Sequence, residues 1–112
     1  VHGLTFLEAE ENTQWNYAYC PVFIHDALFP MSRDRLYQEL KDQGVFVRRY
    51  FYPLISEFPM YKGYASSAAE NLPVASRMAQ SVLCLPIHPS LSAIEQTKII
   101  DIIMRASAVN AA

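Results

Sequence analysis

Arginine and tyrosine side chains are concentrated in one short run near the middle of the chain, Arg48-Arg49-Tyr50-Phe51-Tyr52. A guanidinium group presents a planar fork of N–H donors that suits phosphate or carboxylate, and a phenol adds a neutral donor beside it. In a strand, neighbouring side chains point to opposite faces, so Arg48 and Arg49 cannot both be hidden in a core without partners. We therefore expect at least one of them to face solvent or an anionic ligand.

An ordinary strand end with salt-bridged arginines is the alternative explanation for this run. Other chemistries find less support in the chain. His2, His25 and His88 lack metal-ligand spacing, so no zinc site is expected. The chain also has no glycine-rich phosphate loop, and Ser66-Ser67 lacks the context of a nucleophile elbow.

The composition indicates one globular domain without a nucleic-acid or membrane partner. Apolar residues make up 52% of the 112 residues, charged residues 18%, and the formal net charge is −2. That is enough apolar material for a core, and no basic cluster marks a phosphate-backbone interface. No apolar run approaches the roughly 20 residues of a membrane span, and no leader is evident, so a soluble cytoplasmic protein is expected. Cys20 and Cys84 are expected to be reduced and buried.

The first half of the chain predicts strand, helix and strand. Residues 1–15 have no clear periodicity and are expected to be a connection arriving from something upstream, with the fold itself in residues 16–112. Residues 16–24 alternate as a strand that is bulged or at an edge at Pro21. Ser32 is expected to cap a helix that ends at Gly44, and residues 45–52 are then predicted as a second strand.

The second half predicts an irregular excursion over residues 54–70 followed by helix, strand and helix. Asn71 is expected to cap the first helix ahead of Pro73, and residues 82–87 are read as a strand. Ser92 and Glu95 form a capping-box pattern for a last helix that runs to about residue 106. Apolar side chains are expected along one side of each helix: Leu36 and Leu40 in the first; Val74, Met78 and Val82 in the second; Ile99, Ile102, Ile103 and Ala106 in the last. The order β-α-β-loop-α-β-α predicts a two-layer α/β fold, with a small, largely antiparallel sheet and helices on one face.

Two longer runs carry a family resemblance: RRYFYPLISEFPMYKG and NLPVASRMAQSVLCLPIHPSLS. Together with the upstream NYAYCPVFI and SRDRLYQELKDQGVFV, they resemble the C-terminal domain of the DegT/StrS family of sugar aminotransferases, over about residues 16–104. The form RRYFYPL is similar to members that aminate nucleotide-linked keto-deoxysugars. The resemblance implies that residues 16–112 form a C-terminal small domain like that of fold-type I aminotransferases, and that residues 1–15 connect it to a missing N-terminal domain.

This resemblance also implies a chemistry that belongs to a longer enzyme. Family members use pyridoxal 5′-phosphate (PLP) to move an amino group, usually from glutamate, onto a keto sugar of a nucleoside diphosphate. Their Schiff-base lysine and phosphate cradle lie in a large N-terminal domain, so no cofactor and no catalytic residue are expected in this chain. The implied partners are that missing domain, the nucleotide-sugar and a second subunit in a homodimer.

By position, Arg49 and Tyr50 match the family's stretch next to the sugar nucleotide, and Arg48 and Tyr52 are further candidates for substrate binding. Two hypotheses follow. In the first, the chain is the C-terminal domain of a nucleotide-sugar aminotransferase, inactive by itself. In the second, it is a free-standing, non-catalytic binding or dimerisation module derived from that domain.

Overall fold

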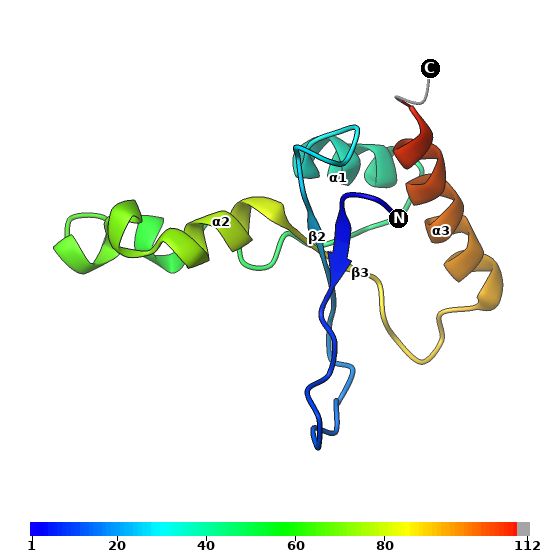
Figure 1. Ribbon diagram of the computed structural model, residues 1–112, viewed down its shortest axis with the longest axis horizontal. Helices are drawn as coiled ribbons and strands as arrows, with labels where there is room; N and C mark the ends of the chain where they lie inside the picture. The colour runs from blue at the N-terminus through cyan, green and yellow to red at the C-terminus, as the bar shows by residue number, and fades with distance from the viewer. Residues whose placement is uncertain (110–112) are drawn as a thin grey trace.

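Three short strands and three α-helices make up the described part of the computed structural model, residues 1–109 (Figure 1). The strands are β1 (Leu4–Phe6), β2 (Cys20–Ile24) and β3 (Val82–Leu85). The helices are α1 (Arg33–Asp42), α2 (Pro73–Ser81) and α3 (Ala93–Ala108). Single 3₁₀ turns at Ile55–Glu57, Ala65–Ser67 and Ala69–Asn71 precede α2.

The strands form one antiparallel sheet in the order β1-β2-β3, which confirms the expected α/β fold with a small antiparallel sheet. Pro21 of β2 lies opposite Cys84 of β3. The backbone N–H and C=O of Cys84 point away from β2 and are both hydrogen-bonded to Arg48. The proline nitrogen therefore points toward the β1 side of β2, where β1 has already ended at Phe6 opposite Val22. Pro21 thus occupies a local edge, where no ladder bond is lost.

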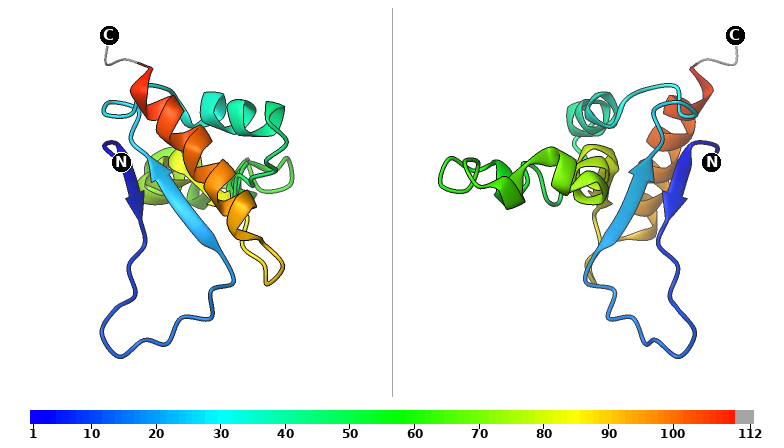
Figure 2. Two further views of the ribbon diagram at one scale, coloured as in Figure 1. Left: turned by 90° about the vertical axis from the view of Figure 1, so that its right-hand side faces the viewer. Right: turned by 60° about the vertical axis from the view of Figure 1, so that its left-hand side comes forward.

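The hydrophobic core lies between one face of the sheet and the helices α1 and α3. Val22, Ile24 and Leu83 supply the sheet side of this core. Leu36 and Leu40 come from α1, and the expected inward face of α3 is confirmed: Ile99, Ile102, Ile103 and Ala106 are all buried. In Figure 1, α3 and α2 extend from opposite sides of the sheet, and Figure 2 agrees. The face turned away from α3 is left more open.

Local capping interactions define both core helices as the sequence predicts. The Ser32 hydroxyl accepts from the Arg35 N–H at the start of α1, and Gly44 adopts φ +79° after its end. At α3, Ser92 and Glu95 form the reciprocal capping box.

Residues 45–52 do not form the predicted strand. Within residues 1–109 this segment pairs with β3 through Arg48 and Cys84 alone, with N···O distances of 3.0 and 2.7 Å. The alternation that suggested a strand is nevertheless real, because Val45 and Val47 are buried while Phe46 and Arg48 are exposed. Side-chain alternation shows which face of a segment is buried, but a β-ladder also needs a neighbouring strand of similar length. The neighbour of this segment, β3, has only four residues.

At the N-terminus, the structure contains a strand that the sequence reasoning did not predict. Residues 1–15 were expected to be a connection, but they include β1, which pairs with β2 from Leu4 to Phe6. A strand of three residues is too short for its alternation to be recognised in the sequence. The division between connection and domain at residue 15 stays a prediction. The strand predicted over residues 16–24 is confirmed from Cys20 onward.

Around α2, the predicted cap is wrong, and of the predicted apolar side only Val82 is buried, with Met78 half-buried. The N-cap position of α2 is occupied by Leu72, so Asn71 lies one residue too early to cap the helix. The side-chain amide of Asn71 instead donates to the carbonyl of Ala65. Val74 is 62% exposed, and Ala79 is the buried residue of α2. The helix is therefore turned differently from the predicted orientation. The strand that follows ends at Leu85, because Pro86 has no N–H to extend the ladder.

Two segments project from the core. All residues of the loop 7–19, which connects β1 to β2, are exposed, and the arm, residues 55–81, leads away from the sheet (Figures 1 and 2). The radius of gyration is 15.9 Å, against about 13 Å for a compact domain of this length. Both segments carry large exposed apolar side chains, including Trp15, Tyr17, Met60 and Tyr64. In the region that the structure describes, no helix has the length and apolar character to cross a membrane.

Gly3→Ala should destabilise the chain. Gly3 has φ +80°, and a Cβ there would lie 2.5 Å from the backbone nitrogen of Phe29. The left-handed conformation alone costs about 1–2 kcal/mol for a residue with a side chain, and the backbone collision adds to it. Gly63→Ala is the matched control, since its added Cβ meets no atom within 4 Å. Urea unfolding of both variants measures the difference; equal stabilities would show that residues 1–6 are not part of the cooperative unit.

By itself the chain is expected to associate and to bind an apolar dye. The cause is the large apolar side chains exposed on the loop 7–19 and on the arm, since monomeric proteins rarely expose large apolar patches. Sedimentation velocity at several concentrations, with fluorescence of an anilinonaphthalene sulfonate dye, tests this. A strictly monomeric species that does not increase the fluorescence of the dye would contradict this prediction.

Candidate functional site

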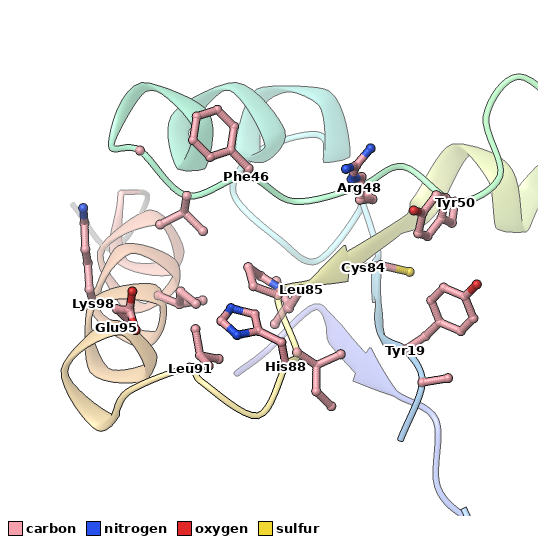
Figure 3. A pocket seen from close by; sticks show the side chains of 16 residues that line it. Tyr19, Phe46, Arg48, Tyr50, Cys84, Leu85, His88, Leu91, Glu95 and Lys98 are labelled. Atoms are coloured by element: carbon pink, nitrogen blue, oxygen red, sulfur yellow. The ribbon is translucent and has the colours of Figure 1, made fainter. Parts of the chain in front are cut away.

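A cleft of about 600 Å³ opens along the exposed side of residues 44–50 (Figure 3). Because side chains alternate along this segment, Phe46, Arg48 and Tyr50 face the same side and form one wall of the cleft. The loop after β3 and the start of α3 form the opposite wall. Tyr19, at the end of the loop 7–19, closes one end and packs edge-on against Tyr50, with ring centroids 5.5 Å apart.

Positive charge and neutral donors predominate in this cleft. Arg48 is exposed and forms no ion pair with a carboxylate of residues 1–109. Lys98 from α3 and His88 from the loop after β3 line the same cleft. Its one carboxylate, Glu95, is engaged by Ser92, whose hydroxyl and backbone N–H both donate to it, at 2.7 and 2.8 Å. The cleft can therefore receive an anionic ligand.

The hydrogen bonds from Ser92, and secondarily the nearby His88, lower the pKa of Glu95 from its ordinary value. Glu95 thus remains a carboxylate around neutral pH. The negative charge of Glu95 stabilises the N-terminus of α3, where free helix N–H groups and the macrodipole favour an anion. It offsets the positive charge of the cleft without being directed at Arg48.

A different set of side chains lies on the reverse side of the segment. The Arg49 guanidinium donates to Asp34 Oδ1 at 3.0 Å, and it lies over the rings of Tyr37 and Tyr52, 4.6 and 5.2 Å from their centroids. Arg33 lies 4.8 Å from the centroid of the same Tyr52 ring. We call these five residues, Arg33, Asp34, Tyr37, Arg49 and Tyr52, the arginine–tyrosine cluster.

Arg33 is the buried member of the cluster, 3% exposed. One terminal nitrogen donates to the carbonyl of Ala79 at 2.8 Å and is 3.3 Å from that of Val82, both at the C-terminal end of α2. Its Nε lies 2.8 Å from Asp34 Oδ1, but the N–H is not directed at that oxygen, so the contact is one of charge. Helix carbonyls, a carboxylate and a ring face together compensate for burial of the cation.

The four residues singled out in the sequence therefore divide into two pairs. Arg48 and Tyr50 reach the cleft, while Arg49 and Tyr52 belong to the arginine–tyrosine cluster. The sequence reasoning missed both Tyr19 and Lys98 as parts of the site. Nothing in the local sequence marks either one, because they come from distant segments.

Sequence reasoning also missed Arg33 and Asp34, although a signal for Arg33 was present. Arg33 lies three residues before Leu36 and seven before Leu40, so all three share the buried face of α1. A charged residue at such a position requires partners elsewhere in the fold.

A second hollow, of about 350 Å³, lies on the face of the sheet turned away from α3. Its lining is mostly apolar and includes Pro21, Phe23, Phe51, Leu54 and Met78. This apolar groove adjoins the cleft, since Tyr19 and Tyr50 line both.

The cysteines and acidic residues do not add a reactive centre. Cys20 and Cys84 are free, and burial raises the pKa of both thiols, so neither is poised as a thiolate at neutral pH. Across residues 1–109, no group of three or more His, Cys, Asp or Glu side chains could hold a metal ion.

Comparison with known proteins reveals close relatives of this chain. The model of the DegT/DnrJ/EryC1/StrS aminotransferase family matches residues 1–104. A dTDP-4-amino-4,6-dideoxy-D-glucose transaminase of Escherichia coli is 48% identical over 90 residues, which are 80% of this chain and 24% of that protein.

Solved structures show the same relationship. A DegT/DnrJ/EryC1/StrS aminotransferase from Brucella abortus superposes with a TM-score of 0.76 at 26% identity, covering 94% of this chain and 26% of that one. An aminotransferase from Streptoalloteichus hindustanus gives 0.79 at 25% identity, covering 98% and 28%. The chain thus spans about a quarter of the length of these relatives. The resemblance of its central runs is confirmed, and the chain belongs to the DegT/DnrJ/EryC1/StrS aminotransferase family.

Proposed function

We propose that this chain is the C-terminal domain of a PLP-dependent aminotransferase that moves an amino group from glutamate to a nucleotide-linked keto-deoxysugar. In this proposal the domain lines the sugar-nucleotide pocket. The observation that carries it is the cleft beside the RRYFYPL run, which presents Arg48, exposed and without an ion pair among residues 1–109, beside Tyr50 (Figure 3). Family membership supplies the chemistry to which such a cleft would contribute.

The substrate class agrees with the charge of the cleft. The Escherichia coli relative is named for a dTDP-linked aminodeoxysugar. A nucleoside diphosphate is negatively charged, and Arg48 and Lys98 would bind its phosphates. Arginine stays protonated at any working pH, so Arg48 would bind and orient the substrate rather than transfer a proton. Tyr50 and Tyr19 offer phenol donors beside it. Arg49 and Tyr52 would support this wall from its reverse side.

We propose that the PLP site lies outside the described residues. Lys41, Lys62 and Lys98 are all exposed, and none is enclosed in a cavity as a Schiff-base lysine is. PLP supplies an electron sink when bound, and the protein around it supplies orientation and electrostatics. We therefore assign the cofactor, its lysine and its phosphate cradle to the remaining part of a longer protein.

The same longer protein would cover the apolar surfaces left open here. The apolar groove, the loop 7–19 and the arm expose aromatic and aliphatic side chains around the cleft. We propose that the N-terminal PLP domain packs on this side and that the complete enzyme is a homodimer. The projecting shape of the chain supports this arrangement, because the loop and the arm lack a core of their own.

In the complete enzyme, Arg48→Ala should raise the KM for the nucleotide-sugar. Loss of a charge-assisted contact costs about 1.5–3 kcal/mol, which corresponds to about tenfold to a hundredfold in binding. The half-reaction with glutamate should be spared, because it does not use the sugar-nucleotide contacts. Steady-state and single-turnover kinetics measure both.

Arg35→Ala, which removes the same charge from the exposed surface of α1, is the control. Arg49→Ala distinguishes the two arginines, since it breaks the ion pair with Asp34 and should lower the melting temperature. If Arg48→Ala left the sugar kinetics intact while Arg49→Ala raised the KM, the substrate contact would belong to Arg49.

The chain alone should neither bind PLP covalently nor transaminate, because its lysines lack an enclosing site. Absorbance scans of the chain mixed with PLP, followed by borohydride reduction and peptide mapping, test this. Stoichiometric labelling of one lysine would overturn the assignment of the cofactor to another part of the protein. Labelling spread over several exposed lysines would agree with it.

A further inference from the structure

The wall of the cleft that carries Arg48 and Tyr50 has little backbone support. Among residues 1–109, the Arg48–Cys84 pair is its one bridge to the sheet. Beyond it, Tyr50 and Tyr52 lie outside any strand or helix. Contacts of side chains must therefore hold residues 49–52 in place. The arginine–tyrosine cluster, directly behind this wall, provides such contacts.

Asp34 joins the two cations of that cluster. Its Oδ1 atom lies 3.0 Å from a terminal nitrogen of Arg49 and 2.8 Å from Nε of Arg33. Both guanidinium groups also lie against the Tyr52 ring, 4.8 and 5.2 Å from its centroid. Without the carboxylate, two like charges would remain around one ring, and their repulsion would drive the movable one away.

Of the two, Arg33 is the fixed member. It is buried, and it is anchored to the carbonyl of Ala79 at the C-terminal end of α2. Arg49 is 34% exposed in its side chain and belongs to the weakly paired segment. Loss of the Asp34 charge would therefore release Arg49, and with it the adjoining residues Arg48 and Tyr50.

We propose that Asp34 is a positioning residue of the substrate pocket, acting through Arg49 to hold Arg48 and Tyr50 in place along the cleft. This inference rests on the proposed function of the cleft. Asp34 itself does not line the cleft, so it would touch neither sugar nor nucleotide. Its effect would come from placing groups that do.

The test compares Asp34→Asn with Asp42→Asn in the complete enzyme. Both variants remove one exposed carboxylate charge from α1, but Asp42 lies at the far end of the helix and accepts from Gln38. Asp34→Asn should raise the KM for the nucleotide-sugar about two- to fivefold, the range expected for a partly exposed ion pair, with the glutamate half-reaction unchanged. Hydrogen exchange should accelerate in peptides that cover residues 48–54, and Asp42→Asn should change neither quantity.

The outcomes separate this inference from the proposed function. If Arg48→Ala raises the sugar KM and Asp34→Asn leaves it unchanged, the cleft binds substrate and Asp34 does not position it. If Asp34→Asn accelerates exchange throughout α1 instead of in residues 48–54, its role is to stabilise the helix N-terminus, and the inference is wrong. If Arg48→Ala has no effect on the sugar, the assignment of this cleft to the substrate fails. Asp34→Asn then has no substrate contact to position, so the inference fails with it, whatever the exchange shows.

Discussion

The burial of one cation, Arg33, requires partners from several parts of this small domain. Arg33 lies on the core face of α1 among aliphatic side chains, where an uncompensated guanidinium group would be strongly destabilising. Its compensation comes from three directions: carbonyls at the end of α2, the carboxylate of Asp34, and the ring of Tyr52. Each partner belongs to a different part of the chain. Satisfying Arg33 therefore joins α1, α2 and the RRYFYPL run at one point.

That junction also explains how the domain presents a binding wall without building a strand. Val45 and Val47 anchor the segment in the core, and the Arg48–Cys84 pair ties it once to β3. Further along, the stack of Arg49 between Tyr37 and Tyr52 replaces the missing ladder. The backbone is thereby freed from regular pairing at the positions where the side chains face the cleft. Irregular segments held by a rigid scaffold are common at binding sites for this reason.

The remaining surface of the chain exposes many apolar side chains. Helices α1 and α3 cover one face of the sheet, while the other face forms the apolar groove beside the loop 7–19 and the arm. The two solved relatives are about three and a half times as long as this chain, and its fold recurs within them at TM-scores of 0.76 and 0.79. An open apolar face beside a charged cleft is the surface that the proposed packing of a further domain would cover.

Sequence alone determined what depends on neighbours within a few residues. The caps at Ser32 and Ser92, the stop at Gly44 and the buried stripe of α3 rest on contacts three or four positions apart, and the spacing of residue types records them. The alternation of residues 45–48 likewise showed which side chains face the core. Only the tertiary structure decided the pairing of β1, the orientation of α2 and the division of the two arginines between cleft and cluster. Those outcomes depend on partners 15 to 49 residues away, such as Asp34 for Arg49 and Val82 for Arg33, and no local pattern encodes which distant group will satisfy a charge.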